Sequence, residues 1–271
     1  MRRTLLTLVA LAALSLPLPA QDAPRANVKL IGHRGFTRDA VENSMSALEA
    51  AVQLGLAGSE IDLRTTRDGH VVLMHDETVD RTTTGSGAVE AMSYREVTAL
   101  RLERPDGRVV DERVPDLDAV VAFLERHPRF EVAFDAKEVD VQAVGRRVLD
   151  AHVQDRVTFF IADPQDVDHA EAIKRVDPRL RISVNLLTWW KIEGLPTFVR
   201  RSLHADALFA SEYFFPRRFD EAKAAGAEVQ VFIPGTANLI ERFTRAVEMG
   251  ADAVSSDRPD LLVPLVRRST N

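Results

Sequence analysis

Four short polar clusters follow runs of β-prone apolar residues. They are Gly32-His33-Arg34-Gly35, Glu60-Ile61-Asp62, His75-Asp76 and Asp135-Ala136-Lys137. Glu60 and Asp62 are two positions apart, so in a strand both carboxylates point to the same face. Adjacent carboxylates repel each other unless one is protonated or a cation lies between them. With Asp135 as a third oxygen ligand, the set indicates a hard divalent cation, Ca²⁺ or Mg²⁺, rather than zinc.

The cationic residues of these clusters suit the chemistry of a phosphate ester. His33 and His75 can act as acid and base near neutral pH, because histidine titrates in that range. The planar fork of Arg34 matches phosphate. Lys137 lies two positions after Asp135, so it can reach the same site, either as a cation for phosphate or to orient a carboxylate. Together these residues predict the cleavage of a phosphodiester.

Each cluster alone also has an ordinary structural interpretation. Glu-x-Asp is typical of a solvated strand face, and His75-Asp76 of a loop histidine bonded to its neighbour. Asp135-x-Lys137 resembles a surface ion pair, which contributes little to stability. Trp189-Trp190 could form a lip of a site or pack in the core. The functional interpretation therefore depends on the clusters occurring together.

Alternating β-rich and helical patterns are expected to position these clusters. Strands are expected at residues 28–32, 59–63, 130–135, 156–161, 180–184, 207–210, 228–233 and 253–256, with an extended piece at 71–74. Helices are expected at residues 43–54, 116–126, 139–151, 164–176, 217–225 and 236–249. Asn43 is the expected N-cap of the first helix, and Gly55 its C-terminal stop.

The number of these units predicts an α/β fold, a (β/α)₈ TIM barrel with a small insertion after the second strand. About eight β-then-α units in a row close such a barrel, and its enzymes carry their chemistry at the carboxyl ends of the strands. An open doubly wound sheet is the competing architecture. The insertion, residues 76–114, breaks the rhythm and is expected to contain one short helix at 93–100. No second domain is expected in residues 28–271.

Composition and the first residues bear on location and partners. The 271-residue chain has a net charge of −6 and no cysteine. It shows no Lys/Arg stripe interleaved with aromatics, so no nucleic-acid partner is expected. Residues 1–20 read as a signal peptide and 21–27 as a linker, which predicts export to the periplasm or secretion. The apolar run is short for a membrane span, so no stable span is expected after cleavage, although an uncleaved anchor is the alternative. The oligomeric state is not predicted.

The motifs together resemble the glycerophosphodiester phosphodiesterase family, whose members are (β/α)₈ barrels. The matching stretches are Ile31-Gly32-His33-Arg34-Gly35, Glu42-Asn43-Ser44, Glu60-Ile61-Asp62-Leu63, Thr66-Arg67-Asp68-Gly69, Met74-His75-Asp76, Asp80-Arg81-Thr82-Thr83, Val114-Pro115-Asp116-Leu117 and Ser256-Asp257-Arg258-Pro259-Asp260. The match is dense up to Asp140, thin to about Glu228 and recognisable again near the C-terminus.

The resemblance implies a role for each residue of the clusters. His33 and His75 would be the catalytic acid–base pair, and Arg34 would contact phosphate. Glu60 and Asp62 would bind the divalent cation. The expected reaction is metal-dependent hydrolysis of a small glycerophosphodiester to sn-glycerol 3-phosphate and an alcohol.

Two departures from the family pattern concern the third ligand and the substrate. The family usually has Glu-x-Lys where this chain has Asp135-Ala136-Lys137, and Asp is one methylene shorter. Sphingomyelinase D-like phospholipases use Asp there, which favours a lipid-active alternative. The seventh strand usually ends in a Trp-Thr-Val-Asn-like stretch, and here Phe232 keeps only a ring for substrate contact.

Two alternatives follow. The first is phospholipase D-like cleavage of a lysophospholipid or sphingolipid headgroup, by hydrolysis or by internal transfer to a cyclic phosphate. The second belongs to another class, a non-catalytic protein that binds a phosphate ligand. The presence of both histidines and all three carboxylates favours an enzyme over a binding protein.

Overall fold

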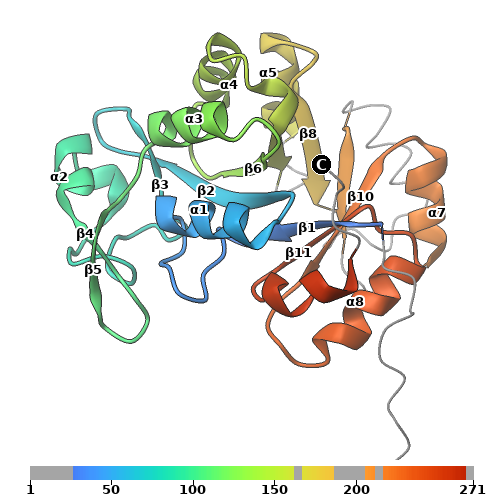
Figure 1. The fold of residues 1–271 in the computed structure, drawn as a ribbon. Helices are drawn as coiled ribbons and strands as arrows, with labels where there is room; N and C mark the ends of the chain where they lie inside the picture. The colour runs from blue at the N-terminus through green and yellow to red at the C-terminus, as the bar shows by residue number, and fades with distance from the viewer. Residues whose placement is uncertain (1–26, 162–166, 186–204, 211–215, 267–271) are drawn as a thin grey trace, which may run out of the picture.

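The computed structural model describes residues 27–161, 167–185, 205–210 and 216–266 (Figure 1). The predicted leader at 1–20, the linker up to residue 26, the predicted helix start at 164 and Trp189-Trp190 lie outside the described residues. The leader and the linker therefore stay predictions.

Within the described part of the chain, eight parallel strands close into a barrel. They are β1 (Lys29–Gly32), β2 (Gly58–Thr65), β6 (Glu131–Ala136), β7 (Val157–Ile161), β8 (Arg181–Asn185), β9 (Ala207–Ala210), β10 (Glu228–Ile233) and β11 (Ala253–Ser256). Each strand pairs in parallel with the next, and β1 pairs with both β2 and β11. The last pairing closes the sheet, so the predicted barrel is confirmed and the open doubly wound sheet is wrong.

Helices connect the barrel strands and lie outside them (Figure 1). They are α1 (Met45–Leu54), α3 (Leu117–Arg126), α4 (Val141–Asp150), α5 (Val167–Val176), α7 (Pro216–Ala224) and α8 (Leu239–Glu248). Two 3-10 turns, Pro259–Leu261 and Val263–Leu265, follow the last strand. Strand alternation separates the two faces of the sheet: in β10, Val229, Val231 and Ile233 are buried, while Gln230 and Phe232 line a cavity inside the barrel mouth.

The start of α1 differs from the prediction. The N-cap is Ser44, whose side chain accepts a hydrogen bond from the Ala47 amide. Asn43 is not the cap, because its amide is bonded to Asp62 instead. The predicted stop is confirmed, since Gly55 is the C-cap with a φ of 82°.

The insertion is a small body beside the barrel (Figure 1). It follows β3 (Val71–Leu73), which pairs antiparallel with β2. It contains a 3-10 turn (Val89–Ala91), α2 (Tyr94–Ala99) and the hairpin of β4 (Arg101–Glu103) and β5 (Val109–Arg113). The predicted helix is confirmed, but the hairpin was not predicted. A second apolar cluster joins five residues of the insertion, Val79, Val89, Val97, Leu102 and Val114, to Val41, Val72 and Met74.

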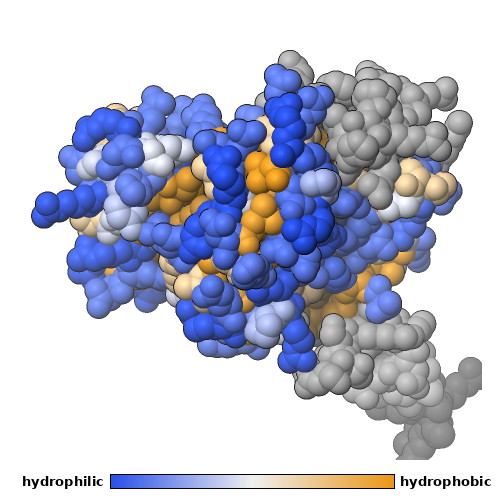
Figure 2. Space-filling view, turned by 90° about the horizontal axis from the view of Figure 1, so that it is seen from above, coloured by the Kyte–Doolittle hydropathy of each residue, from blue (hydrophilic) through white to orange (hydrophobic). Residues whose placement is uncertain are grey.

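The surface of the described residues offers little apolar area. Hydrophilic residues dominate the face seen from above (Figure 2). The exposed large hydrophobic side chains among the described residues are Val109, Ile240 and Leu261. In the described ranges, no helix is both long and apolar enough to cross a membrane.

Candidate active site

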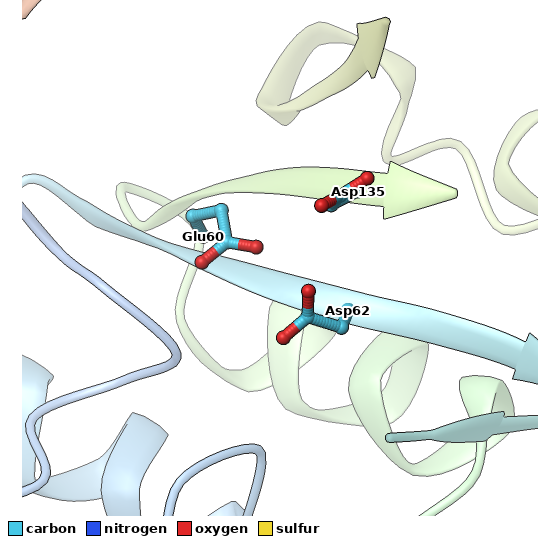
Figure 3. A group of neighbouring side chains, drawn as sticks. All are labelled: Glu60, Asp62 and Asp135. Atoms are coloured by element: carbon cyan, nitrogen blue, oxygen red, sulfur yellow. The ribbon is translucent and has the colours of Figure 1, made fainter. Parts of the chain in front are cut away.

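Three carboxylates converge at the barrel mouth. Glu60 and Asp62 extend from β2 and Asp135 from β6, and their side chains point toward one another (Figure 3). Asp62 and Asp135 are direct partners in the β2–β6 register. One oxygen from each carboxylate lies within 4.8 Å of the others. Because Ca²⁺–oxygen distances are about 2.3–2.6 Å, one ion can contact all three.

The electrostatics of this cluster favour a bound cation. Burial, together with the carboxylates of Asp62 and Asp135, raises the pKa of Glu60 well above its ordinary value. Burial also raises the pKa of Asp135, although Lys137 opposes the shift. Asp62 is only 1% exposed. Three acidic groups with little access to water need a proton or a cation to offset their repulsion.

Each candidate catalytic histidine is paired with an aspartate through Nδ1. His33 Nδ1 lies 2.6 Å from Asp257 Oδ1, and His75 Nδ1 lies 2.6 Å from Asp76 Oδ1. The pKa of Asp257 is lower than its ordinary value. Burial alone would raise this pKa, but the hydrogen bonds with His33 and with the Gly235 backbone amide together have the larger effect.

The pKa of Asp76 is held well below its ordinary range, mainly by hydrogen bonds from Arg81. An ionised aspartate can only accept a hydrogen bond, so Nδ1 of each histidine is the donor. This fixes the tautomer and leaves Nε2 as the nitrogen free to exchange a proton with a substrate.

Two cationic residues, Arg34 and Lys137, contact the three carboxylates. Arg34 donates from its backbone amide to Glu60 at 3.1 Å and from Nη1 to Glu42 at 2.9 Å. Its Nε lies 3.4 Å from Asp62 Oδ2 and, within the described residues, is a buried donor without a hydrogen bond.

Lys137 pairs with Asp135 and lies 3.1 Å from Asp62 Oδ1. The pKa of Lys137 is higher than its ordinary value. Burial alone would lower this pKa, but the carboxylates of Asp62 and Asp135 together have the larger effect. The spacing allowed Lys137 to bind phosphate or to orient a carboxylate, and its contacts with two carboxylates fit the second role.

A cavity of about 210 Å³ contains the site. Its lining includes every predicted site residue except Lys137: His33, Arg34, Glu60, Asp62, His75, Asp135 and Phe232. The Phe232 ring lies 4.6 Å from the His33 ring, centroid to centroid. Phe209 on the neighbouring strand β9 and Phe160 on β7 continue an aromatic wall.

Sequence reasoning gave no role to several residues that hold the site. Asp257, Glu42 and Arg81 belong to motifs of the resemblance, but each has a partner in a different motif: His33 for Asp257, and Glu42 and Arg81 for each other. Asn43 bonds Asp62 from both ends of its amide, with Nδ2 to Oδ2 at 2.7 Å and Oδ1 to the Asp62 amide at 3.0 Å. The only sequence signal for these residues is that each stands within a matching motif.

The barrel carries a carboxylate cluster, two histidines and an arginine at its mouth. This combination defines a class of protein, the barrel hydrolases of phosphate esters. The profile of the glycerophosphoryl diester phosphodiesterase family matches residues 33–261. The chain belongs to this family and is an enzyme, a phosphoric diester hydrolase.

Relatives and solved structures agree with this assignment. The chain is 28% identical over 249 residues to a glycerophosphodiester phosphodiesterase of Caldanaerobacter subterraneus, which covers 88% of this chain and 98% of the relative. It is 40% identical over 129 residues to mouse glycerophosphodiester phosphodiesterase 1, covering 45% of this chain and 39% of the relative.

The crystal structure of a glycerophosphodiester phosphodiesterase from Agrobacterium tumefaciens superposes with a TM-score of 0.75 at 27% identity, covering 88% and 99% of the two chains. A phosphodiesterase of Oleispira antarctica, solved with its product sn-glycerol-3-phosphate, has a TM-score of 0.71 at 22% identity, covering 88% and 96%. At that identity the second structure supports the fold alone.

Proposed function

We propose that this enzyme hydrolyses glycerophosphodiesters to sn-glycerol 3-phosphate and an alcohol, with a divalent cation and with His33 and His75 as the acid–base pair. The observation that carries the proposal is the convergence of both histidines and three carboxylates on one cavity. The matching family model and the relatives named as glycerophosphodiester phosphodiesterases support the choice of substrate class.

The donor set fits a hard divalent cation, Ca²⁺ or Mg²⁺. Glu60, Asp62 and Asp135 offer oxygen atoms only, and they come within 4.8 Å of one another. The shorter side chain of Asp135 still reaches the other two carboxylates, so the departure from Glu leaves the ligand set intact. When bound, such a cation would neutralise phosphate charge and so favour attack on phosphorus.

The two histidines divide the proton transfers of hydrolysis. One accepts the proton of the attacking water as its oxygen bonds to phosphorus, and the other protonates the leaving alkoxide as the ester P–O bond breaks. Asp257 and Asp76 keep Nε2 of each ring free for these transfers. Arg34 also lines this cavity, and its guanidinium carries the positive charge that a phosphate oxygen requires.

The place of action is proposed from the first residues of the chain. Their signal-peptide pattern predicts export to the periplasm or secretion. Small glycerophosphodiesters there would be the substrates, and the phosphate of the product would remain on glycerol.

Hydrolysis of glycerophosphocholine tests the proposal. We expect turnover with Ca²⁺ or Mg²⁺, loss of turnover in EDTA, and loss in His33→Ala and His75→Ala. Phosphorus NMR should show sn-glycerol 3-phosphate as the product. Full activity in EDTA or in either histidine variant would contradict the mechanism. A cyclic phosphate, or activity confined to lysophospholipids, would favour the lipid-cleaving alternative instead.

A further inference from the structure

Arg81 of the insertion forms two forked ion pairs at the edge of the site. Its Nε donates to Asp76 Oδ2 at 2.6 Å and its Nη2 to Asp76 Oδ1 at 3.0 Å. The same guanidinium donates from Nη1 to Glu42 Oε2 at 2.8 Å and from Nη2 to Glu42 Oε1 at 2.7 Å. One side chain of the insertion therefore holds two carboxylates from different parts of the chain.

Each of these carboxylates holds a residue that faces the cavity. Asp76 Oδ1 is 2.6 Å from His75 Nδ1. Glu42 Oε1 accepts from Arg34 Nη1 at 2.9 Å. Arg81 thus stands in the middle of a continuous chain of hydrogen bonds that begins at His75 and ends at Arg34.

The geometry suits an arginine and no other residue. A guanidinium presents its donors in a rigid plane and can pair with two carboxylates at once, whereas a lysine ammonium is a point charge. The carboxylates of Glu42 and Asp76 are 19% and 28% exposed, so the pairs are partly shielded from water. The pKa of Glu42 is lower than its ordinary value. Burial alone would raise this pKa, but Arg81 and Arg34 together have the larger effect.

We propose that Arg81 is a positioning residue for the hydrolysis, which holds Asp76 against His75 and Glu42 against Arg34. The insertion then contributes to the site through a side chain. It sets the orientation of a proton-transferring group and of a phosphate-binding group through one side chain. The inference rests on the proposed function, because it requires that His75 and Arg34 act on the substrate.

Steady-state kinetics with glycerophosphocholine and a saturating divalent cation separate the two arms. Asp76→Asn should lower kcat about 10–100-fold with little change in KM, because it disturbs His75. Glu42→Gln should chiefly raise KM, because it releases Arg34 from its ion pair. Arg81→Gln should do both. In the double variant of Arg81→Gln with Asp76→Asn, kcat should fall no further than in the worse single variant, because the two residues act as a unit.

Controls distinguish positioning from a general effect on folding. Arg101→Gln removes another partly exposed arginine of the insertion, one paired with Asp111, and should leave kcat and KM within about twofold of wild type. Thermal unfolding is measured on every variant. If Arg81→Gln does not fold, Arg81→Lys replaces it with the same expectation, since lysine keeps the charge but not the fork.

Three outcomes would overturn either this inference or the proposed function. Wild-type kcat and KM in Arg81→Gln, with His75→Ala inactive, would overturn this inference and leave the proposed function standing. Wild-type activity in His75→Ala would overturn the proposed function itself. Equal losses in Arg81→Gln and Arg101→Gln would also overturn the inference, because the effect would then belong to the insertion as a whole.

Discussion

At the scale of single residues, the candidate site is two histidine–aspartate pairs beside a carboxylate cluster. The pairs differ in sequence separation: His75 bonds its neighbour Asp76, whereas His33 bonds Asp257, 224 positions away. The pKa values of both aspartates are lowered, mainly by the hydrogen bonds that their carboxylates accept. Each therefore keeps its histidine in one tautomer, which is a condition for efficient proton transfer.

Replacing Asp257 tests this role. In Asp257→Asn the amide can donate to Nδ1 and so favour the wrong tautomer of His33. We expect kcat to fall about 100-fold or more, while the affinity for the divalent cation and the thermal unfolding midpoint stay near wild type. Asp260→Asn, in the same motif but paired with Arg258, is the matched control and should keep its activity. Unchanged kcat in Asp257→Asn would remove Asp257 from the mechanism.

At the scale of elements, the turn after β1 places His33 and Arg34. The turn runs in the left-handed region, with φ of 56° at Arg34 and 92° at Gly35. It packs closely on α1, because a Cβ on Gly35 would lie 2.5 Å from the Cβ of Ala47. The Arg34 backbone carbonyl accepts a hydrogen bond from the backbone amide of Asn43, which ties the turn to the residues before α1.

Gly35→Ala should therefore be costly for two separate reasons, backbone strain and a clash. We expect it to lower the free energy of unfolding by about 2–3 kcal/mol in urea titrations, and to reduce activity because His33 moves. Gly69→Ala separates the two causes: its φ is 84°, but nothing lies within 4 Å of the added Cβ. That control should cost only about 1 kcal/mol. Equal costs would show that the contact with Ala47 is unimportant.

At the scale of the whole molecule, barrel closure brings carboxylates together at a cost that a cation can offset. A carboxyl whose pKa is raised in the folded protein holds its proton more tightly there than in the unfolded chain. Glu60 and Asp135 are such groups. Their contribution to stability is therefore lost as pH rises from the ordinary carboxyl range through the raised pKa values.

The stabilisation by Ca²⁺ or Mg²⁺ should consequently grow with pH. We expect the cation to raise the unfolding midpoint more at about pH 8 than at about pH 5. At the lower pH the cation must displace protons from the carboxyl groups of Glu60 and Asp135, and this displacement reduces the stabilisation. At a free concentration about 100 times Kd the stabilisation should approach about 3 kcal/mol. Differential scanning calorimetry with cation and with EDTA measures it. Glu60→Gln is the control and should flatten the pH dependence, and equal shifts at both pH values in the wild type would contradict the prediction.

Local patterns were sufficient for most elements. Hydrophobic periodicity predicted the barrel strands, with β9, β10 and β11 at the observed bounds, because each strand must alternate or run apolar to pack against helices. The β4–β5 hairpin was missed, since β5 is mostly exposed and alternates between intermediate and exposed positions without an apolar face. The N-cap of α1 was misassigned to Asn43, because its bond to Asp62 depends on a strand that the local sequence does not contain.

The sequence by itself predicted which residues could do chemistry and that Glu60 and Asp62 share one face of a strand, since both follow from residue type and from the period of a strand. Only the tertiary structure decided their partners. The bond between His33 and Asp257 exists because β1 pairs with β11, and Arg81 reaches Glu42 because the insertion contacts the segment between β1 and α1. Contacts between residues so distant in sequence depend on how strands and loops meet in the closed barrel, and no local pattern encodes which side chains become partners.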